Sequence, residues 1–111
     1  DRDLPAAPVL ATIKKDGKDV EAVIQIAKTG FVFVLDRATG APLFPIEEKP
    51  VPPSDLEGEA AWPTQPVPTL PKPFARQAFT EQMINTVTGE ADSIRKRFAG
   101  VRTGEPFIPP S

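Results

Sequence analysis

The sequence predicts a mainly β protein: a four-stranded antiparallel sheet in its first half, then a proline-rich loop and a short helical insertion. Three observations support this prediction. Short apolar runs between residues 9 and 46 are separated by turn signals that contain glycine. Most of the 15 prolines lie between Pro42 and Pro73. Helical patterns are confined to residues 80–99.

Four strands are expected in the first half. Residues 9–13 form the first, and a polar stretch that contains Gly17 turns the chain into the second, 20–27. The third, 31–36, is almost entirely apolar and aromatic, which is typical of a strand buried on both faces. The fourth, 41–46, contains two prolines and is therefore expected at a sheet edge, where a missing N–H costs least.

We expect three sequential parts: the sheet in residues 1–48, the proline-rich loop in 49–79, and the helical insertion with an extended tail in 80–111. The loop follows from proline chemistry, because proline removes a backbone donor and fixes φ. Thr80 is expected to cap a short helix, and a second helix over 90–99 is expected to end at Gly100. Since nothing in the chain is long enough to cover both faces of the third strand, we expect the chain to need neighbours from a larger protein.

The composition excludes several classes of site. The chain has no cysteine and no histidine, so a disulfide framework, a thiol site and the usual zinc sites are excluded. Its 13 Lys and Arg residues are scattered among 15 Asp and Glu, and no nucleic-acid partner is expected. No apolar run approaches the roughly 18 residues that a membrane span needs, and no apolar leader region opens the sequence.

Lys28 is the main candidate for a functional residue. It stands in Ala-Lys-Thr-Gly, at the corner between the second and third strands. Two interpretations are open: a solvated lysine beside a tight turn, or a lysine at the ligand-facing end of the sheet that donates to an oxyanion or quinone oxygen. Asp1 and Asp3 either ligate a cation or act as a base, or they are polar residues at a chain start. The second corner, Asp36 to Gly40, is expected to be turn chemistry.

Four stretches of the chain carry a family resemblance. In order, they are DRDLPAAPVL, AKTGFVFVLDRATGAPLFPIEEKPVPPSD, PTQPVPTLPKPFARQAFT and EPFIPPS. They resemble the membrane-associated, pyrroloquinoline-quinone (PQQ)-dependent dehydrogenases of bacteria, above all the glucose, quinate and polyol dehydrogenases. The combination Lys-Thr-Gly-x-x-x-Val-Leu-Asp-Arg-x-x-Gly with Glu-Lys-Pro-Val-Pro is specific, whereas each element alone is weak. Residues 81–103 match least well.

The resemblance implies an eight-bladed β-propeller made of four-stranded antiparallel blades. This chain would supply one propeller blade and the insertion that leads towards the next. Its partners would be the remaining blades, a sugar or polyol substrate and a membrane quinone as electron acceptor. The enzyme would be periplasmic and attached to the inner membrane through parts outside this chain.

The resemblance also implies roles for two residues. Lys28 corresponds to a lysine that hydrogen-bonds the quinone carbonyls of PQQ, and Asp1 to the aspartate that accepts the proton of the substrate hydroxyl. Hydride would pass from the substrate carbon to PQQ, while a Ca²⁺ or Mg²⁺ ion polarises the quinone carbonyl and Lys28 stabilises the negative charge.

The functional prediction is therefore a part of a quinoprotein dehydrogenase that is inactive by itself. Two alternatives stay open. One is a non-catalytic β-propeller scaffold in which Lys28 is merely solvated. The other is a free-standing binding module with a proline-rich recognition loop. The sequence does not choose among glucose, quinate, shikimate and polyol substrates, or between the two metals.

Overall fold

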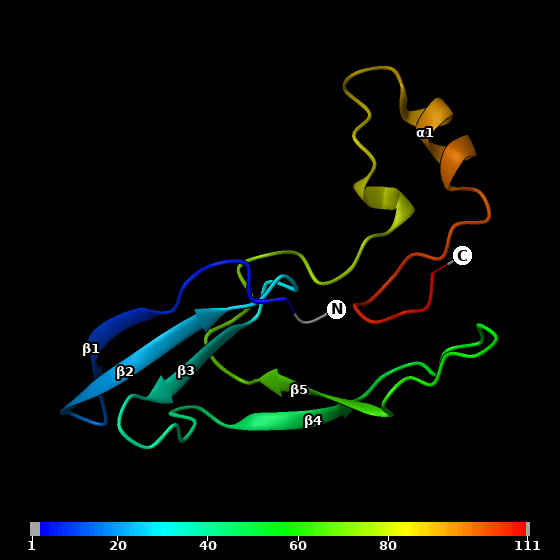
Figure 1. The fold of residues 1–111 in the computed structure, drawn as a ribbon. Helices are drawn as coiled ribbons and strands as arrows, with labels where there is room; N and C mark the ends of the chain where they lie inside the picture. The colour runs from blue at the N-terminus through cyan, green and yellow to red at the C-terminus, as the bar shows by residue number, and fades with distance from the viewer. Residues whose placement is uncertain (1–2, 111) are drawn as a thin grey trace. The chain divides into compact units, whose positions relative to one another are not determined.

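A computed structural model describes residues 3–110 of the chain. Within them lie five strands in two antiparallel sheets, a short 3₁₀-helix and one α-helix (Figure 1). The chain divides into two compact units, Asp1–Pro50 with Thr64–Arg76, and Val51–Pro63 with Gln77–Ser111. The expected division into three sequential parts stays a prediction. No helix in the described residues is both long enough and apolar enough to cross a bilayer.

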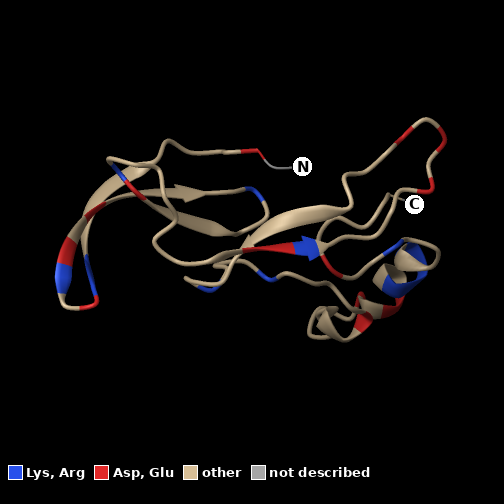
Figure 2. Ribbon diagram, turned by 90° about the horizontal axis from the view of Figure 1, so that it is seen from below, with Lys and Arg blue, Asp and Glu red and all other residues tan. Residues whose placement is uncertain are grey.

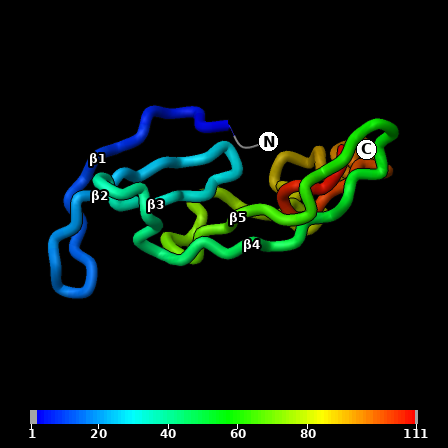
Figure 3. Tube along the Cα trace, turned by 60° about the horizontal axis from the view of Figure 1, so that its bottom comes forward, coloured from blue at the N-terminus to red at the C-terminus, as the bar shows by residue number. Residues whose placement is uncertain are grey.

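The first sheet contains three strands in the order β1 (Val9–Lys15), β2 (Lys18–Ile26) and β3 (Val32–Asp36) (Figure 3). Both pairs are antiparallel. The first two strands are joined by Asp16 and Gly17, whose φ angles of 51° and 76° are both positive. An Asp-Gly pair of this kind makes the two-residue turn that matches the twist of a hairpin. The first three expected strands and the turn between 14 and 19 are thus confirmed.

The buried hydrophobic residues of this sheet lie on β2, on β3 and at the corner between them: Ala22, Ala27, Phe31 and Val34. Gly30 at that corner and Pro68 in the segment Thr64–Pro68 are buried as well. Ala22 has no exposed surface. The other residues of β3 are half-buried, so β3 is only partly covered within the described chain. Val9 and Leu10 of β1 are each 60 % exposed. Because successive strand residues point to opposite faces, β1 leaves an apolar side chain exposed on each face.

The expected fourth strand, and with it the four-stranded sheet, is wrong. Beyond β3 the pairing is limited to one bridge between Leu35 and Pro42, and to bonds such as that from the Leu43 N–H to the Val34 carbonyl, 2.9 Å. The physical reason lies in Pro42 and Pro45, which have no N–H to continue a ladder. The chain therefore leaves the sheet.

The second sheet spans the end of the expected sheet region, 1–48, and part of the expected proline-rich loop, 49–79. β4 (Ile46–Pro50) pairs antiparallel with β5 (Thr64–Pro68). β5 contains Pro66 and Pro68, opposite Glu48 and Ile46. Both strands of a two-stranded sheet are edge strands, the position in which proline is tolerated. An edge strand thus forms within the proline-rich stretch, in agreement with the expectation that its prolines exclude a central strand.

The helical segments belong to the second unit. η1 (Glu81–Met83) follows Thr80, whose side chain makes no cap hydrogen bond. α1 (Ala91–Phe98) confirms the helix expected over 90–99, and the chain turns after it at Gly100, whose φ is 89°. The rings of Phe79 and Phe98 pack with their centroids 5.1 Å apart.

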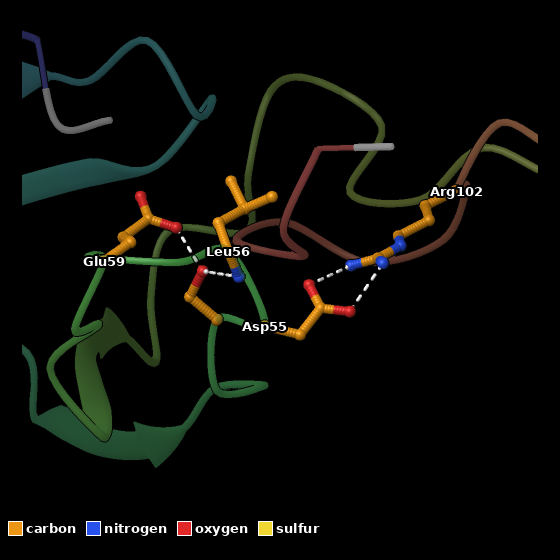
Figure 4. Close-up of polar contacts among 5 residues, drawn as sticks. Asp55, Leu56, Glu59 and Arg102 are labelled. Carbon is orange, nitrogen blue, oxygen red and sulfur yellow. Dashed lines mark hydrogen bonds and ion pairs between the residues drawn. The ribbon is translucent and has the colours of Figure 1, made fainter.

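A double hydrogen bond joins two segments of the second unit (Figure 4). Arg102 Nη1 and Nη2 donate to the two carboxylate oxygens of Asp55, at 2.7 and 2.6 Å. Beside it, the Ser54 hydroxyl donates to the Glu59 carboxylate and accepts the N–H of Leu56. Hydrogen bonds from Arg102 lower the pKa of Asp55, and those same bonds raise the pKa of Arg102.

The Asp55 carboxyl is therefore expected to titrate below its ordinary value of 3.8. Because the pKa is lowered in the folded state, the ion pair stabilises the unit above the ordinary pKa, and this contribution is lost as the pH falls through the folded-state pKa. NMR of carboxyl-labelled aspartate measures the pKa of Asp55. In the variant Arg102→Gln, this pKa should rise towards 3.8. Asp36 is the control, since its lowered pKa comes first from the Thr39 N–H. An unchanged Asp55 titration in the variant would contradict the assignment.

Candidate functional site

The corner between β2 and β3 is a tight turn that carries Lys28. The Ala27 N–H donates to the Phe31 carbonyl at 2.9 Å, and the Gly30 N–H donates to the Ala27 carbonyl at 2.8 Å. Gly30 has a φ of 87°, a conformation that a glycine adopts without steric cost. Ala27, Gly30 and Phe31 are buried, whereas the Lys28 side chain is 58 % exposed. The turn is thus fixed by its backbone and presents the ammonium to solvent.

Two other segments of the same unit bind this turn through backbone hydrogen bonds. The Lys28 N–H donates to the Asp3 carbonyl at 2.9 Å, and the Phe74 N–H donates to the Gly30 carbonyl at 3.1 Å. The N-terminal segment has a further attachment nearby, because Gln25 Nε2 donates to the Ala6 carbonyl at 3.0 Å. The backbone around Lys28 is therefore fixed by bonds within the turn, by the N-terminal segment and by the segment that contains Phe74.

The structure brings together two of the candidate residues. Lys28 Nζ lies 3.3 Å from Asp3 Oδ2, and the Asp3 side chain is 65 % exposed. The sequence pointed to Asp3 as a base or a cation ligand, but no sequence signal pointed to its pairing with Lys28. Asp1 lies outside the described residues, so its role as proton acceptor stays a prediction.

The second corner is the turn that its sequence indicated. Asp36 Oδ1 accepts the N–H groups of Ala38 and Thr39 at 2.9 and 2.8 Å, and the Thr39 hydroxyl at 2.9 Å. Gly40 follows with a φ of 74°. Because all these bonds close the turn on itself, this corner has a complete structural explanation.

Metal ligands do not gather in the described part of the chain. Across residues 3–110, no three His, Cys, Asp or Glu side chains lie close enough to hold a metal ion. The expected Ca²⁺ or Mg²⁺ therefore stays a prediction. The exposed Lys28 ammonium carries three N–H donors at the end of a flexible stem. Its donation to a quinone carbonyl stays a prediction.

Comparison with known protein families identifies the family of this chain. The model of the family "PQQ: Glucose/ethanol/alcohol dehydrogenase, beta-propeller domain" matches residues 1–111. This chain belongs to the PQQ-dependent dehydrogenase family. The resemblance seen in the sequence is thus confirmed, and both antiparallel sheets lie within the residues that match the family's β-propeller domain. The propeller itself stays a prediction.

Individual members of the PQQ-dependent dehydrogenase family are similar to part of the chain. Quinoprotein glucose dehydrogenase of Escherichia coli (strain K12) is 47 % identical over 70 residues, which cover 63 % of this chain and 9 % of the relative. A probable quinate dehydrogenase (quinone) of Xanthomonas campestris pv. juglandis is 46 % identical over 68 residues, 60 % of this chain and 9 % of the relative. The glycerol dehydrogenase large subunit of Gluconobacter thailandicus is 50 % identical over 52 residues, 46 % of this chain and 7 % of the relative.

The chain thus spans less than a tenth of the length of these three relatives. No solved structure gives a significant match.

Proposed function

We propose that this chain is part of a quinoprotein dehydrogenase that oxidises a hydroxyl group of a sugar or polyol with PQQ as its cofactor. The observation that carries the proposal is the Lys28 turn: a rigid, glycine-closed corner that exposes one ammonium group, in a chain that matches the family model over residues 1–111. Relatives named for glucose, quinate and glycerol support the class of substrate. The complete protein that contains this chain is called the parent below.

In this function, Lys28 donates hydrogen bonds to a carbonyl oxygen of PQQ. When bound, PQQ would supply the acceptor for the hydride of the substrate carbon, and Lys28 would face the carbonyl oxygen on which negative charge develops. A positioned ammonium stabilises that charge more strongly in a water-excluded site than in bulk water. Asp1 would accept the proton of the substrate hydroxyl, a role that rests on the family resemblance.

The proposed parent contains an eight-bladed propeller, to which this chain contributes strands of one blade and the insertion after them. The exposure of Val9 and Leu10 on opposite faces of β1 supports neighbouring blades on both sides. A Ca²⁺ or Mg²⁺ ion beside PQQ, a membrane quinone as electron acceptor, and attachment to the periplasmic side of the inner membrane complete the proposal. These three features rest on the resemblance.

Dye reduction by the parent tests the function. With PQQ and Mg²⁺ or Ca²⁺ added, we expect a cofactor-dependent rate with at least one of glucose, quinate, shikimate and glycerol. The 111-residue chain alone should give no such rate, because in the proposed propeller the rest of the cofactor site would lie on other blades. No cofactor-dependent rate with any of these substrates would contradict the proposal, and a rate from the isolated chain would contradict its dependence on the parent.

A non-catalytic scaffold or binding module is the second candidate. The observation that favours it is the exposure of the Lys28 and Asp3 side chains, 58 % and 65 %, because exposed ion pairs are common on protein surfaces. Under this alternative, the Lys28 ammonium is merely solvated. Removing it would then leave PQQ binding and dehydrogenase activity unchanged.

A further inference from the structure

The contacts of Lys28 point to a positioning role for a second residue. We propose that the Asp3 carboxylate orients the Lys28 ammonium for its contact with the quinone cofactor. This role rests on the proposed function and adds to it a residue that determines where the ammonium lies. Asp3 acts through Lys28 and is therefore a positioning residue.

Two separate contacts join Asp3 and Lys28. The Asp3 carbonyl accepts the Lys28 N–H at 2.9 Å, and its carboxylate lies 3.3 Å from Lys28 Nζ. The backbone bond places the start of the Asp3 side chain next to the turn. The bond from Gln25 to the Ala6 carbonyl attaches the same segment a second time. The carboxylate therefore comes from a segment anchored at two points and not from a loose chain start.

The contact can orient the ammonium without contributing much stability. Lysine has a long, flexible stem and loses considerable rotamer freedom when its end is fixed. An exposed ion pair gains little net stability, but it favours the side-chain conformations that keep the ammonium near the carboxylate. An ammonium carries three donors, so contact with one carboxylate oxygen is compatible with simultaneous donation to a cofactor oxygen.

A second exposed Asp–Lys pair in the described residues offers a contrast. Lys14 Nζ lies 3.9 Å from Asp19 Oδ1 at the hairpin between β1 and β2, where charges of both signs alternate (Figure 2). That pair connects neighbouring strands that are already joined by backbone bonds. Asp3 and Lys28 are 25 positions apart and connect the N-terminal segment to the candidate site.

A double-mutant cycle in the parent tests the role of Asp3. The variants are Asp3→Asn, which removes the charge and keeps the shape, Lys28→Ala, and both together. The readouts are the affinity of the apoprotein for PQQ, measured by equilibrium titration, and kcat in dye reduction. Since a displacement of about 1 Å can cost about 10²-fold in rate, we expect Asp3→Asn to lower affinity, kcat or both about tenfold. With Lys28 already absent, Asp3→Asn should change neither.

Asp19→Asn is the matched control, because it removes one charge from an exposed Asp–Lys pair away from the candidate site. It should leave both readouts unchanged. A loss of PQQ affinity of the same size with and without Lys28 would assign Asp3 a structural role and overturn the proposal. No loss from Asp3→Asn, together with a clear loss from Lys28→Ala, would overturn the positioning role while the proposed function stands. If Lys28→Ala itself changes nothing, the function proposed for Lys28 fails and the role of Asp3 fails with it.

Discussion

Lys28→Ala in the parent is expected to lower PQQ-dependent dye reduction about 10²-fold or more, since that is the typical cost of losing one positioned donor to a developing negative charge. The turn itself should survive, because its hydrogen bonds join the backbones of Ala27, Gly30 and Phe31. The loss should therefore lie in the chemistry and in PQQ affinity and not in folding. Initial rates at saturating PQQ and substrate measure the first effect, and titration of the apoprotein measures the second.

Lys18→Ala is a suitable control for this experiment. Lys18 is an exposed lysine at the start of β2, and the exchange removes the same atoms and the same charge. It should leave the rate within twofold or so of the wild type, in line with the small effects of most surface substitutions. If Lys28→Ala behaves like Lys18→Ala, Lys28 is a solvated lysine, and the scaffold alternative gains support.

Ala22→Asp is expected to cost the first sheet at least about 3 kcal/mol of stability. Ala22 has no exposed surface and lies in β2, between its partners Ala11 on β1 and Asp36 on β3. An aspartate there buries a carboxylate without an opposite charge in a space that holds only a methyl group. Amide hydrogen exchange in peptides that cover β2 and β3 of the parent measures the free energy of opening this sheet.

Ala38→Asp provides the same chemical change at an exposed site. Ala38 lies in the turn after β3, and aspartate is well tolerated in turns. Its exchange protection should remain close to that of the wild type. Equal protection in Ala22→Asp and Ala38→Asp would show that the centre of β2 is not the core that the structure describes.

The sheet was predictable where local chemistry decides the conformation. The apolar runs of β1, β2 and β3 and the Asp16–Gly17 turn are short-range signals, and the structure confirms them. The contradicted element, the fourth strand, involves proline. Proline prevented this strand as a missing donor should, yet β5 forms with Pro66 and Pro68 because each strand of its sheet is an edge. Whether a strand lies at an edge depends on its partners, which the sequence of that strand does not contain.

In the candidate site, too, the local turn was predictable from the sequence and the long-range contact was not. Lys28 and its Thr-Gly corner were recognisable, because consecutive residues of the sequence determine the turn. The contact with Asp3 depends on where the N-terminal segment folds, 25 positions away. The two hydrogen bonds between Asp55 and Arg102 join residues 47 positions apart, and no sequence pattern indicated them either. Contacts at such separations are set by packing and not by the pattern around either residue.

The open side of β1 has a consequence for handling the isolated chain. β1 is an outer strand of its sheet, so one row of its backbone N–H and C=O groups has no strand partner within this sheet. The same strand exposes Val9 and Leu10. An unprotected edge with apolar side chains is a template on which further copies can add, the first step of aggregation. Outside its parent, the chain is therefore expected to be more prone to aggregation than within it.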